Sequence, residues 1–311
     1  MPPTDFPSME PQRNGWHAHP SPPPPPPRQR PHYHTHILLF LMTMVTTIVA
    51  GMVWEGLNPI EQIHEFHRGL PYAITLLTIL LFHEMGHYLT ARYYGMDVTL
   101  PYFLPAPPPL FIGTFGAFIR MRSPARHRRA LLYVGAAGPI AGFCVALPAM
   151  IYAYTTATVV PVTPSPASLS FAEPLLLQFI GRAILGPIQE GYAIHLNSVG
   201  LAAWFGIFVT VLNLLPMGQL DGGHIVYAIF GPHARYVSWA VVCLLFVLGF
   251  FFLGWYLWAV LGWLTSRRPQ VVLDPYTPLD RRSLMIAGIA GAIFILCFMP
   301  IPITIGEIAG S

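Results

Sequence analysis

The sequence predicts an all-α polytopic membrane protein with about six transmembrane helices and a re-entrant β-like loop between the second and the third. Three observations predict this class: the 311 residues are 54% hydrophobic, only 9% are charged, and the mean hydropathy is +0.55. About 25% of the residues of a soluble domain are charged, so this chain has too few to cover a globular surface. The small net charge of +3 gives no basic footprint for nucleic acid. The three cysteines lie in apolar runs, which excludes a disulfide scaffold.

The apolar runs place the expected helices, since a spanning helix needs about 20 mostly apolar residues. The expected spans are 36–54, 69–91, 131–154, 199–217 and 284–305. A longer run, 237–264, is either one tilted span or a broken one that is hinged near Gly249–Gly254.

Two connections between these runs have a distinctive composition. Residues 96–122 carry Val, Thr, Phe and Ile among prolines and glycines, which favours strands and turns. Non-helical backbone at membrane depth is tolerated where protein or a water-filled cavity surrounds it. We therefore expect a re-entrant β-like loop here. Residues 171–188 are expected to form a short amphipathic helix in the membrane interface.

Arginine placement predicts the orientation in the membrane. A cluster lies just before the third span and consists of Arg120, Arg122, Arg126, Arg128 and Arg129. The positive-inside rule places this cluster, and with it the ends of the second and fourth spans, in the cytosol. A single crossing by 237–264 would leave the arginines of 267–282 outside, against the rule, and a re-entrant run would satisfy it. Both topologies stay open at this point.

The second span ends in a motif with metal-binding spacing. After the apolar stretch 70–82 the chain reads His83-Glu84-Met85-Gly86-His87. Positions i and i+4 share one face of a helix, so both imidazoles can reach one metal ion, with Glu84 beside it as a general base. Ionisable side chains inside a membrane are costly and indicate a functional site. The alternative is that these side chains lie at the interface or form a polar contact between helices.

A catalytic zinc ion takes a third protein ligand and keeps one position open. Asp221 is the only Asp between Asp97 and Asp274, and it follows the fourth span, which runs in the same direction as the second. Pro216 and Gly218 should break the helix, so that the carboxylate can turn inwards at the depth of the two histidines. The alternative is an ordinary Asp-Gly turn that leaves the membrane.

These motifs resemble those of the site-2 protease family of intramembrane zinc metalloproteases. HEMGH (83–87) matches the family's HExxH, NLLPMGQLDGG (213–223) resembles its Asn-x-x-Pro…Leu-Asp-Gly motif, and GTFGAFI (113–119) resembles the glycine-containing strand between them. The resemblance covers roughly residues 70–305. The layout is similar to that of archaeal and chloroplast-type members, without a PDZ-like insert after the second span or a CBS-like domain after the last.

The resemblance implies a role for each motif residue. His83, His87 and Asp221 bind one Zn²⁺ ion, and Glu84 takes a proton from the activated water and passes it to the leaving amine. Asn213 is the candidate donor to the oxyanion, with a polar contact between helices as the alternative.

Two further expectations concern neighbours of these residues. His224 either supports Asp221 as a partner of a metal ligand or is a plain interfacial histidine. Gly113, Phe115 and Gly116 either belong to an edge strand that binds an extended substrate or form a merely structural loop.

The expected function is zinc-dependent intramembrane proteolysis of single-span membrane proteins near the cytosolic side. The resemblance alone suggests the substrate, an anti-sigma factor or a membrane-tethered transcription factor. A metal transporter or channel, and a pseudoprotease that binds membrane partners without cutting them, are the alternatives. We expect contact with the lipid bilayer, no nucleic-acid partner and, because no transit segment precedes the tail, a prokaryotic plasma membrane.

The expected organisation has four parts. Residues 1–35 form a disordered Pro/His-rich cytosolic tail, and 36–68 form the first transmembrane helix with its outer loop. The catalytic membrane core is 69–223, and 224–311 contains the C-terminal transmembrane helices.

Overall fold

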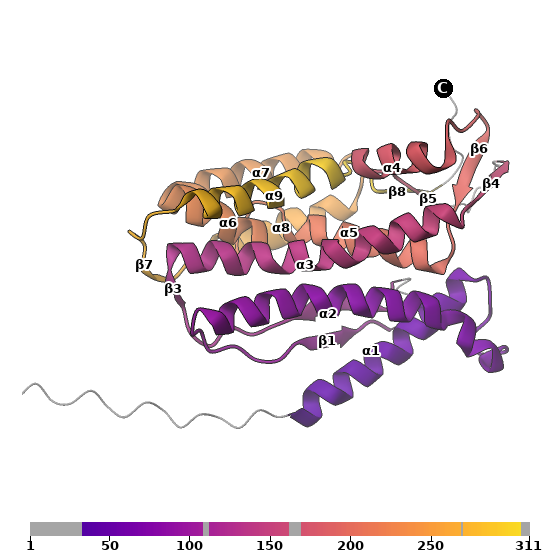
Figure 1. The fold of residues 1–311 in the computed structure, drawn as a ribbon, viewed down its shortest axis with the longest axis horizontal. Coiled ribbons are helices and arrows are strands. Elements are labelled where there is room, and N and C mark those ends of the chain that lie inside the picture. The colour runs from indigo at the N-terminus through magenta and orange to yellow at the C-terminus, as the bar shows by residue number, and fades with distance from the viewer. Residues whose placement is uncertain (1–32, 108–111, 162–168, 269, 306–311) are drawn as a thin grey trace, which may run out of the picture. The chain divides into compact units, whose positions relative to one another are not determined.

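Long helices that run side by side dominate the computed structural model (Figure 1). The structure describes residues 33–107, 112–161, 169–268 and 270–305. Within these ranges, four helical stretches are long and apolar enough to cross a membrane, namely Tyr33–Trp54, Ile63–Tyr93, Arg128–Thr155 and Asp221–Leu248. The expected total of six spans stays a prediction. The Pro/His-rich tail falls outside the described residues except for 33–35, which belong to the first helix.

The helices have the following bounds. They are α1 (Tyr33–Trp54), α2 (Leu70–Tyr93, preceded by the 3-10 helix Ile63–Gly69), α3 (Arg128–Thr155), α4 (Leu175–Leu185), α5 (Ser198–Asn213), α6 (Asp221–Phe230), α7 (Ala234–Leu248), α8 (Gly254–Ser266) and α9 (Arg281–Cys297). Helix α4 confirms helical structure within 171–188, and its place in the interface stays a prediction.

The core lies where α2, α3 and α5 pack together. Leu76 and Ile79 of α2, Met150 of α3, and Phe205 and Ile207 of α5 are almost fully buried there. Small residues bring the helices close, since a Cβ on Gly206 of α5 would lie 2.7 Å from the Ile79 side chain. This packing fixes α2, which carries the HExxH motif.

The connection 96–122 forms a β-hairpin, as its composition predicts. Strand β1 (Tyr102–Pro105) pairs antiparallel with β2 (Thr114–Phe118), with Tyr102 opposite Phe118. The hairpin packs on α1 and α2. Its re-entrant insertion into the membrane stays a prediction.

Three further strand pairs join distant connections. They are the parallel pair β3 (Ala125–His127) and β7 (Val272–Asp274), and the antiparallel pairs β4 (Thr158–Pro161) with β6 (Tyr192–His195) and β5 (Leu169–Phe171) with β8 (Ile303–Ile305).

The run 237–264 is not one helix. Helix α7 ends at Leu248 and α8 begins at Gly254. The ring centroids of Phe246 and Tyr256 are 5.3 Å apart, and a Cβ on Gly262 would lie 3.1 Å from Val242 Cγ2. Phe246 and Tyr256, which flank the turn, contact each other, and Val242 and Gly262, which lie further from it, also contact each other. Helices α7 and α8 therefore form an antiparallel hairpin.

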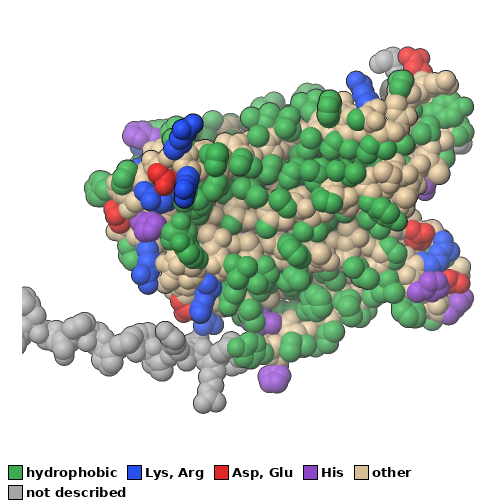
Figure 2. Space-filling view, in the orientation of Figure 1, with side chains coloured by type: hydrophobic (Ala, Val, Ile, Leu, Met, Phe, Trp, Pro, Cys, Tyr) green, Lys and Arg blue, Asp and Glu red, His purple; other side chains and the backbone are tan. Residues whose placement is uncertain are grey.

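This hairpin accounts for the arginines that follow it. Because β7 pairs with β3, and Arg129 Nη2 donates a hydrogen bond of 2.8 Å to the Pro278 carbonyl, the segment after α8 lies beside the arginine cluster before α3. Basic side chains gather at this end of the molecule (left in Figure 2). The geometry favours the broken, returning alternative over a single crossing, and both groups of arginines then obey the positive-inside rule.

Candidate metal centre and active site

Helix α2 places the two histidines of the motif on one face. The helix begins with Pro at its first turn and continues through an apolar run to His83. The imidazoles of His83 and His87 are both buried, and their Nε2 atoms are 3.1 Å apart. The spacing predicted from the sequence therefore brings the two ring nitrogens to one point.

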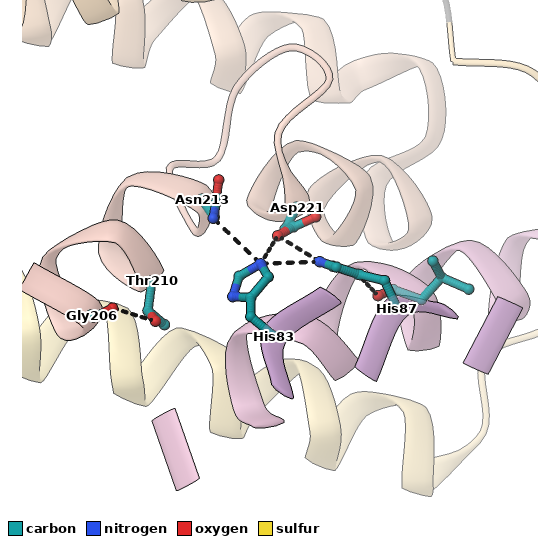
Figure 3. Close-up of polar contacts among 7 residues, drawn as sticks. His83, His87, Gly206, Thr210, Asn213 and Asp221 are labelled. Carbon is teal, nitrogen blue, oxygen red and sulfur yellow. Dashed lines mark hydrogen bonds and ion pairs between the residues drawn. The ribbon is translucent and has the colours of Figure 1, made fainter. Parts of the chain in front are cut away.

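The third candidate ligand comes from the break between α5 and α6. Helix α5 ends at Asn213, Gly218 adopts a positive φ of 55°, and α6 begins at Asp221. Asp221 Oδ2 lies 3.4 Å from His83 Nε2 and 3.2 Å from His87 Nε2 (Figure 3). The expected helix break thus turns the carboxylate towards the histidines.

The arrangement of these three side chains fits a metal ion. His87 Nδ1 lies 2.7 Å from the Val134 carbonyl oxygen, to which it donates, so its Nε2 presents a lone pair towards Asp221. The three potential ligand atoms converge on one point, where all three could bind a single metal ion. Around a tetrahedral zinc ion with bonds of about 2.0–2.1 Å, ligand atoms would be roughly 3.3–3.4 Å apart. Two imidazoles and one carboxylate are also a known ligand set of catalytic zinc.

Helix α3 supports both imidazoles through glycines that the sequence analysis missed. A Cβ on Gly138 would overlap the His87 ring, and one on Gly142 would lie 3.1 Å from His83 Cβ. These residues form a G-x-x-x-G pattern (GPIAG) within an apolar span, which is typical of close helix contacts. That pattern was the available signal for a helix packed against the histidines.

Glu84 lies beside the candidate ligands and is 5% exposed. It lines a cavity of about 210 Å³ together with the three ligands, Asn213 and the end of the hairpin at Ala117–Ile119. Asn213 Nδ2 is 3.3 Å from His83 Nε2, so its amide faces the same point as the ligands.

The weaker candidates lie further from this point. His224 is buried and lines the same cavity, and its Nδ1 donates to Gln270 Oε1 at 2.9 Å. Gln270 also donates to the Gly218 carbonyl, a link between distant segments that the sequence did not indicate. Gly113, just before β2, and Phe115 and Gly116 within it precede the residues that line the cavity.

Both glycines of the hairpin have a positive φ, but their surroundings differ. Gly113 (φ 80°) has a structural reason to be glycine, since a Cβ there would lie 2.6 Å from the Thr46 carbonyl oxygen of α1. Gly116 (φ 99°) has open space around its Cβ position, and the neighbouring Phe115 is 64% exposed. A substrate-binding role for these residues stays a prediction.

The fold and the site together define a helical membrane protein in which two histidines of an HExxH helix and one carboxylate could hold a metal ion. Comparison with known families agrees with this class. The family described as Peptidase family M50 matches residues 71–254, more than half of the chain. The chain belongs to this family, which is the site-2 protease family that its motifs resemble.

Curated relatives match a larger part of the chain. It is 29% identical over 265 residues to the "Probable zinc metalloprotease EGY2, chloroplastic" of Arabidopsis thaliana, which covers 84% of this chain and 47% of that protein. The "Probable zinc metalloprotease EGY1, chloroplastic" of the same plant is 31% identical over 244 residues, with 75% and 43% covered. The chain spans about half the length of the curated relatives it matches. Because their names place these relatives in chloroplasts, they give no support to a prokaryotic plasma membrane.

Proposed function

We propose that this chain is an intramembrane zinc endopeptidase that cleaves single-span membrane proteins near the cytosolic side. One observation carries the proposal. Ligand atoms of His83, His87 and Asp221 converge within 3.1–3.4 Å of one another, next to the buried carboxylate of Glu84. The family membership and the names of the zinc metalloprotease relatives support the same activity.

The residues of this chain hold the metal and fix its surroundings. A zinc ion bound by His83, His87 and Asp221 supplies a Lewis acid that lowers the pKa of a water molecule and polarises the scissile carbonyl. The Val134 carbonyl fixes the tautomer of His87, so that its Nε2 stays free to bind. The Asp221 carboxylate neutralises part of the positive charge in the membrane interior.

Glu84 and Asn213 act on the substrate. Glu84 takes a proton from the attacking water at its carboxylate and later gives it to the nitrogen of the leaving amine. Asn213 Nδ2 donates a hydrogen bond to the oxygen that becomes negatively charged during the attack. A neutral donor suits this place because it adds no further charge beside the metal.

Strand β2 gives an extended substrate a place to bind. Within the described residues β2 pairs only with β1, which leaves its second edge for another strand. The end of this strand reaches the cavity that contains Glu84. A substrate helix that unwinds and adds to the edge, as peptides do at other sheet edges, would carry its backbone past the Glu84 carboxylate. Phe115 and Gly116 would then contact substrate residues further from the cut.

The depth of the site follows from its place on α2. His87 lies six residues before the end of the helix at Tyr93, or about 9 Å at 1.5 Å per residue. That end leads towards the arginine-rich side, which the positive-inside rule assigns to the cytosol. Cleavage near the cytosolic side would release a cytosolic fragment, which suits a regulatory substrate such as a tethered transcription factor or an anti-sigma factor.

The test is cleavage in proteoliposomes by wild type, Glu84→Gln and the control Glu61→Gln, which changes an exposed carboxylate. The substrates are single-span helices with and without Gly, Pro or Asn, assayed with and without a zinc chelator. We expect chelator-sensitive cutting by wild type and Glu61→Gln. Glu84→Gln should keep its zinc and lose about 10²–10⁴-fold in rate.

Two outcomes contradict the proposal. Undiminished cutting by Glu84→Gln would show that Glu84 does not carry the proton in the reaction. Zinc flux across the liposomes that is insensitive to Glu84→Gln, without any cleavage, would instead identify a transporter.

A further inference from the structure

A second cavity, of about 410 Å³, lies against the loop that leads to Asp221. Its walls come from the start of α7, the end of α8 and the loop residue Gly218. The polar side chains that line it include Arg235, Arg267, Arg268, Ser238, Ser266 and Gln270. No residue of the proposed metal centre lines it, so the two cavities are separate sites.

The charge of this cavity is uncompensated. The sequence contains no Asp or Glu between Asp221 and Asp274. None of the three arginines forms an ion pair with any carboxylate of the described residues. The three arginines are exposed, and an anion that entered the cavity would meet their positive charge without having to displace a carboxylate of the described residues.

Two of the arginines are held in place by aromatic neighbours. The Arg267 guanidinium carbon lies 3.7 Å from the centre of the Trp263 ring, and Arg235 Nη2 donates a hydrogen bond of 2.7 Å to the Tyr236 hydroxyl. These contacts reduce the freedom that the side chains would lose on binding. A planar guanidinium donates two parallel hydrogen bonds to a phosphate, which suits arginine better than lysine for this ligand.

Hydroxyl groups add further donors. Ser266 Oγ is buried and has no hydrogen-bond partner among the described residues, although a buried polar atom is costly without one. Ser238 Oγ accepts a hydrogen bond from the Gly218 amide, so its own hydrogen is free to donate. Ala234 and Arg235, at the start of α7, also line the cavity.

We propose that this cavity binds a phosphate group, carried by an anionic phospholipid or by a soluble phosphate compound. A lipid fits the surroundings, because the apolar side chains of Leu244 on α7 and of Leu261 and Leu264 on α8 are exposed and can contact acyl chains. Basic pockets between transmembrane helices on the cytosolic side are known to bind anionic headgroups. The inference concerns binding and does not depend on the proposed proteolysis.

The cavity is also linked to the metal centre. Gln270 Nε2 donates to the Gly218 carbonyl at 2.8 Å, and its Oε1 accepts from His224 Nδ1, three residues after Asp221. A phosphate held here therefore contacts the residues that fix the start of α6.

The experiment compares two double variants of the full chain in neutral detergent. Arg267→Gln/Arg268→Gln removes two charges from the cavity, whereas Arg281→Gln/Arg282→Gln removes two exposed charges from the neighbouring start of α9. Phosphatidic acid and phosphatidylcholine are titrated, and native mass spectrometry counts the bound lipid. We expect the first variant to bind phosphatidic acid at least about tenfold more weakly than wild type, since two charge-assisted hydrogen bonds are lost. The second variant should stay within about twofold.

Equal binding by the cavity variant and wild type, or an equal loss in both double variants, would overturn the proposal. Zinc content reports whether each variant is folded. If the arginine variant does not fold, Ser266→Ala carries the test. This variant removes one hydrogen bond without a change in charge, so we expect it to bind phosphatidic acid about threefold more weakly. Unchanged binding would contradict the proposed phosphate site.

Competition by inorganic phosphate distinguishes the two sources of the ligand. Displacement of the lipid at millimolar phosphate supports a soluble phosphate compound. Retention of the lipid under the same conditions supports the phospholipid headgroup.

Discussion

The two cavities on either side of the loop before α6 contrast in their charge. On one side the candidate metal ligands include a carboxylate, Asp221, whose oxygen lies 3.2 Å from His87 Nε2. On the other side three arginines meet no carboxylate of the described residues. Ionisable groups inside a membrane protein are costly unless they are paired or used. The first set is suited to a cation, and the three exposed arginines of the second favour an anion.

Gly138→Ala tests whether the candidate metal centre needs the close packing of α3 against His87. A Cβ at this position of α3 would overlap the His87 imidazole, so the ring must turn away or the helices must separate. We expect zinc affinity to fall by at least about tenfold, as it does when supporting groups around metal ligands are changed. Titration with a zinc chelator measures the effect.

Gly291→Ala is the matched control, because no atom lies within 4 Å of its Cβ position on α9. If both variants bound zinc equally well, the close contact between Gly138 and His87 would have no role in the site.

Asn213→Ala separates metal binding from catalysis. In the proposed mechanism Asn213 donates to the reacting oxygen and is not a metal ligand, so zinc content should stay unchanged. Loss of such a donor should reduce the cleavage rate by about 10²–10³-fold.

Thr210→Val, one turn earlier on α5, serves as the control for Asn213. Its hydroxyl donates only to the Gly206 carbonyl within the same helix (Figure 3), so this variant should cleave normally. A rate loss of the same size in both variants would reduce the role of Asn213 to a contact between helices.

The smallest expected effect concerns an arginine that does have a partner. Arg129 Nη1 lies 3.7 Å from Asp280 Oδ2, at the same end as the unpaired arginines. Hydrogen bonds from the hydroxyl and then the amide of Ser283, at the start of α9, lower the pKa of the Asp280 carboxyl. A lowered pKa in the folded state means that its stabilisation is present above about pH 4 and is lost as the pH falls through the folded value.

Asp280→Asn keeps the helix cap but removes the charge. Its melting temperature should therefore fall less between pH 5 and pH 3 than that of wild type. The same fall in both proteins would show that Asp280 contributes nothing to the pH dependence.

The sequence predicted the metal side of the molecule better than the arginine side. The i, i+4 spacing of His83 and His87 determines their common face, and Pro216 and Gly218 mark the break that turns Asp221 inwards. By contrast, the turn at Gly249–Leu253 is as apolar as the helices that it joins, so hydropathy could not show that α7 and α8 form a hairpin. The second cavity depends on that hairpin, because it brings Arg267 and Arg235 together from segments about 30 residues apart.

Zinc stoichiometry of the purified protein is the direct test of a metal centre formed by His83, His87 and Asp221. Wild type and Glu84→Gln should each hold one zinc ion per chain by elemental mass spectrometry after dialysis against a weak chelator. His87→Ala should hold almost none, because two remaining ligands cannot complete the site. Equal zinc content in His87→Ala and wild type, or no zinc in wild type, would contradict a metal centre formed by His83, His87 and Asp221.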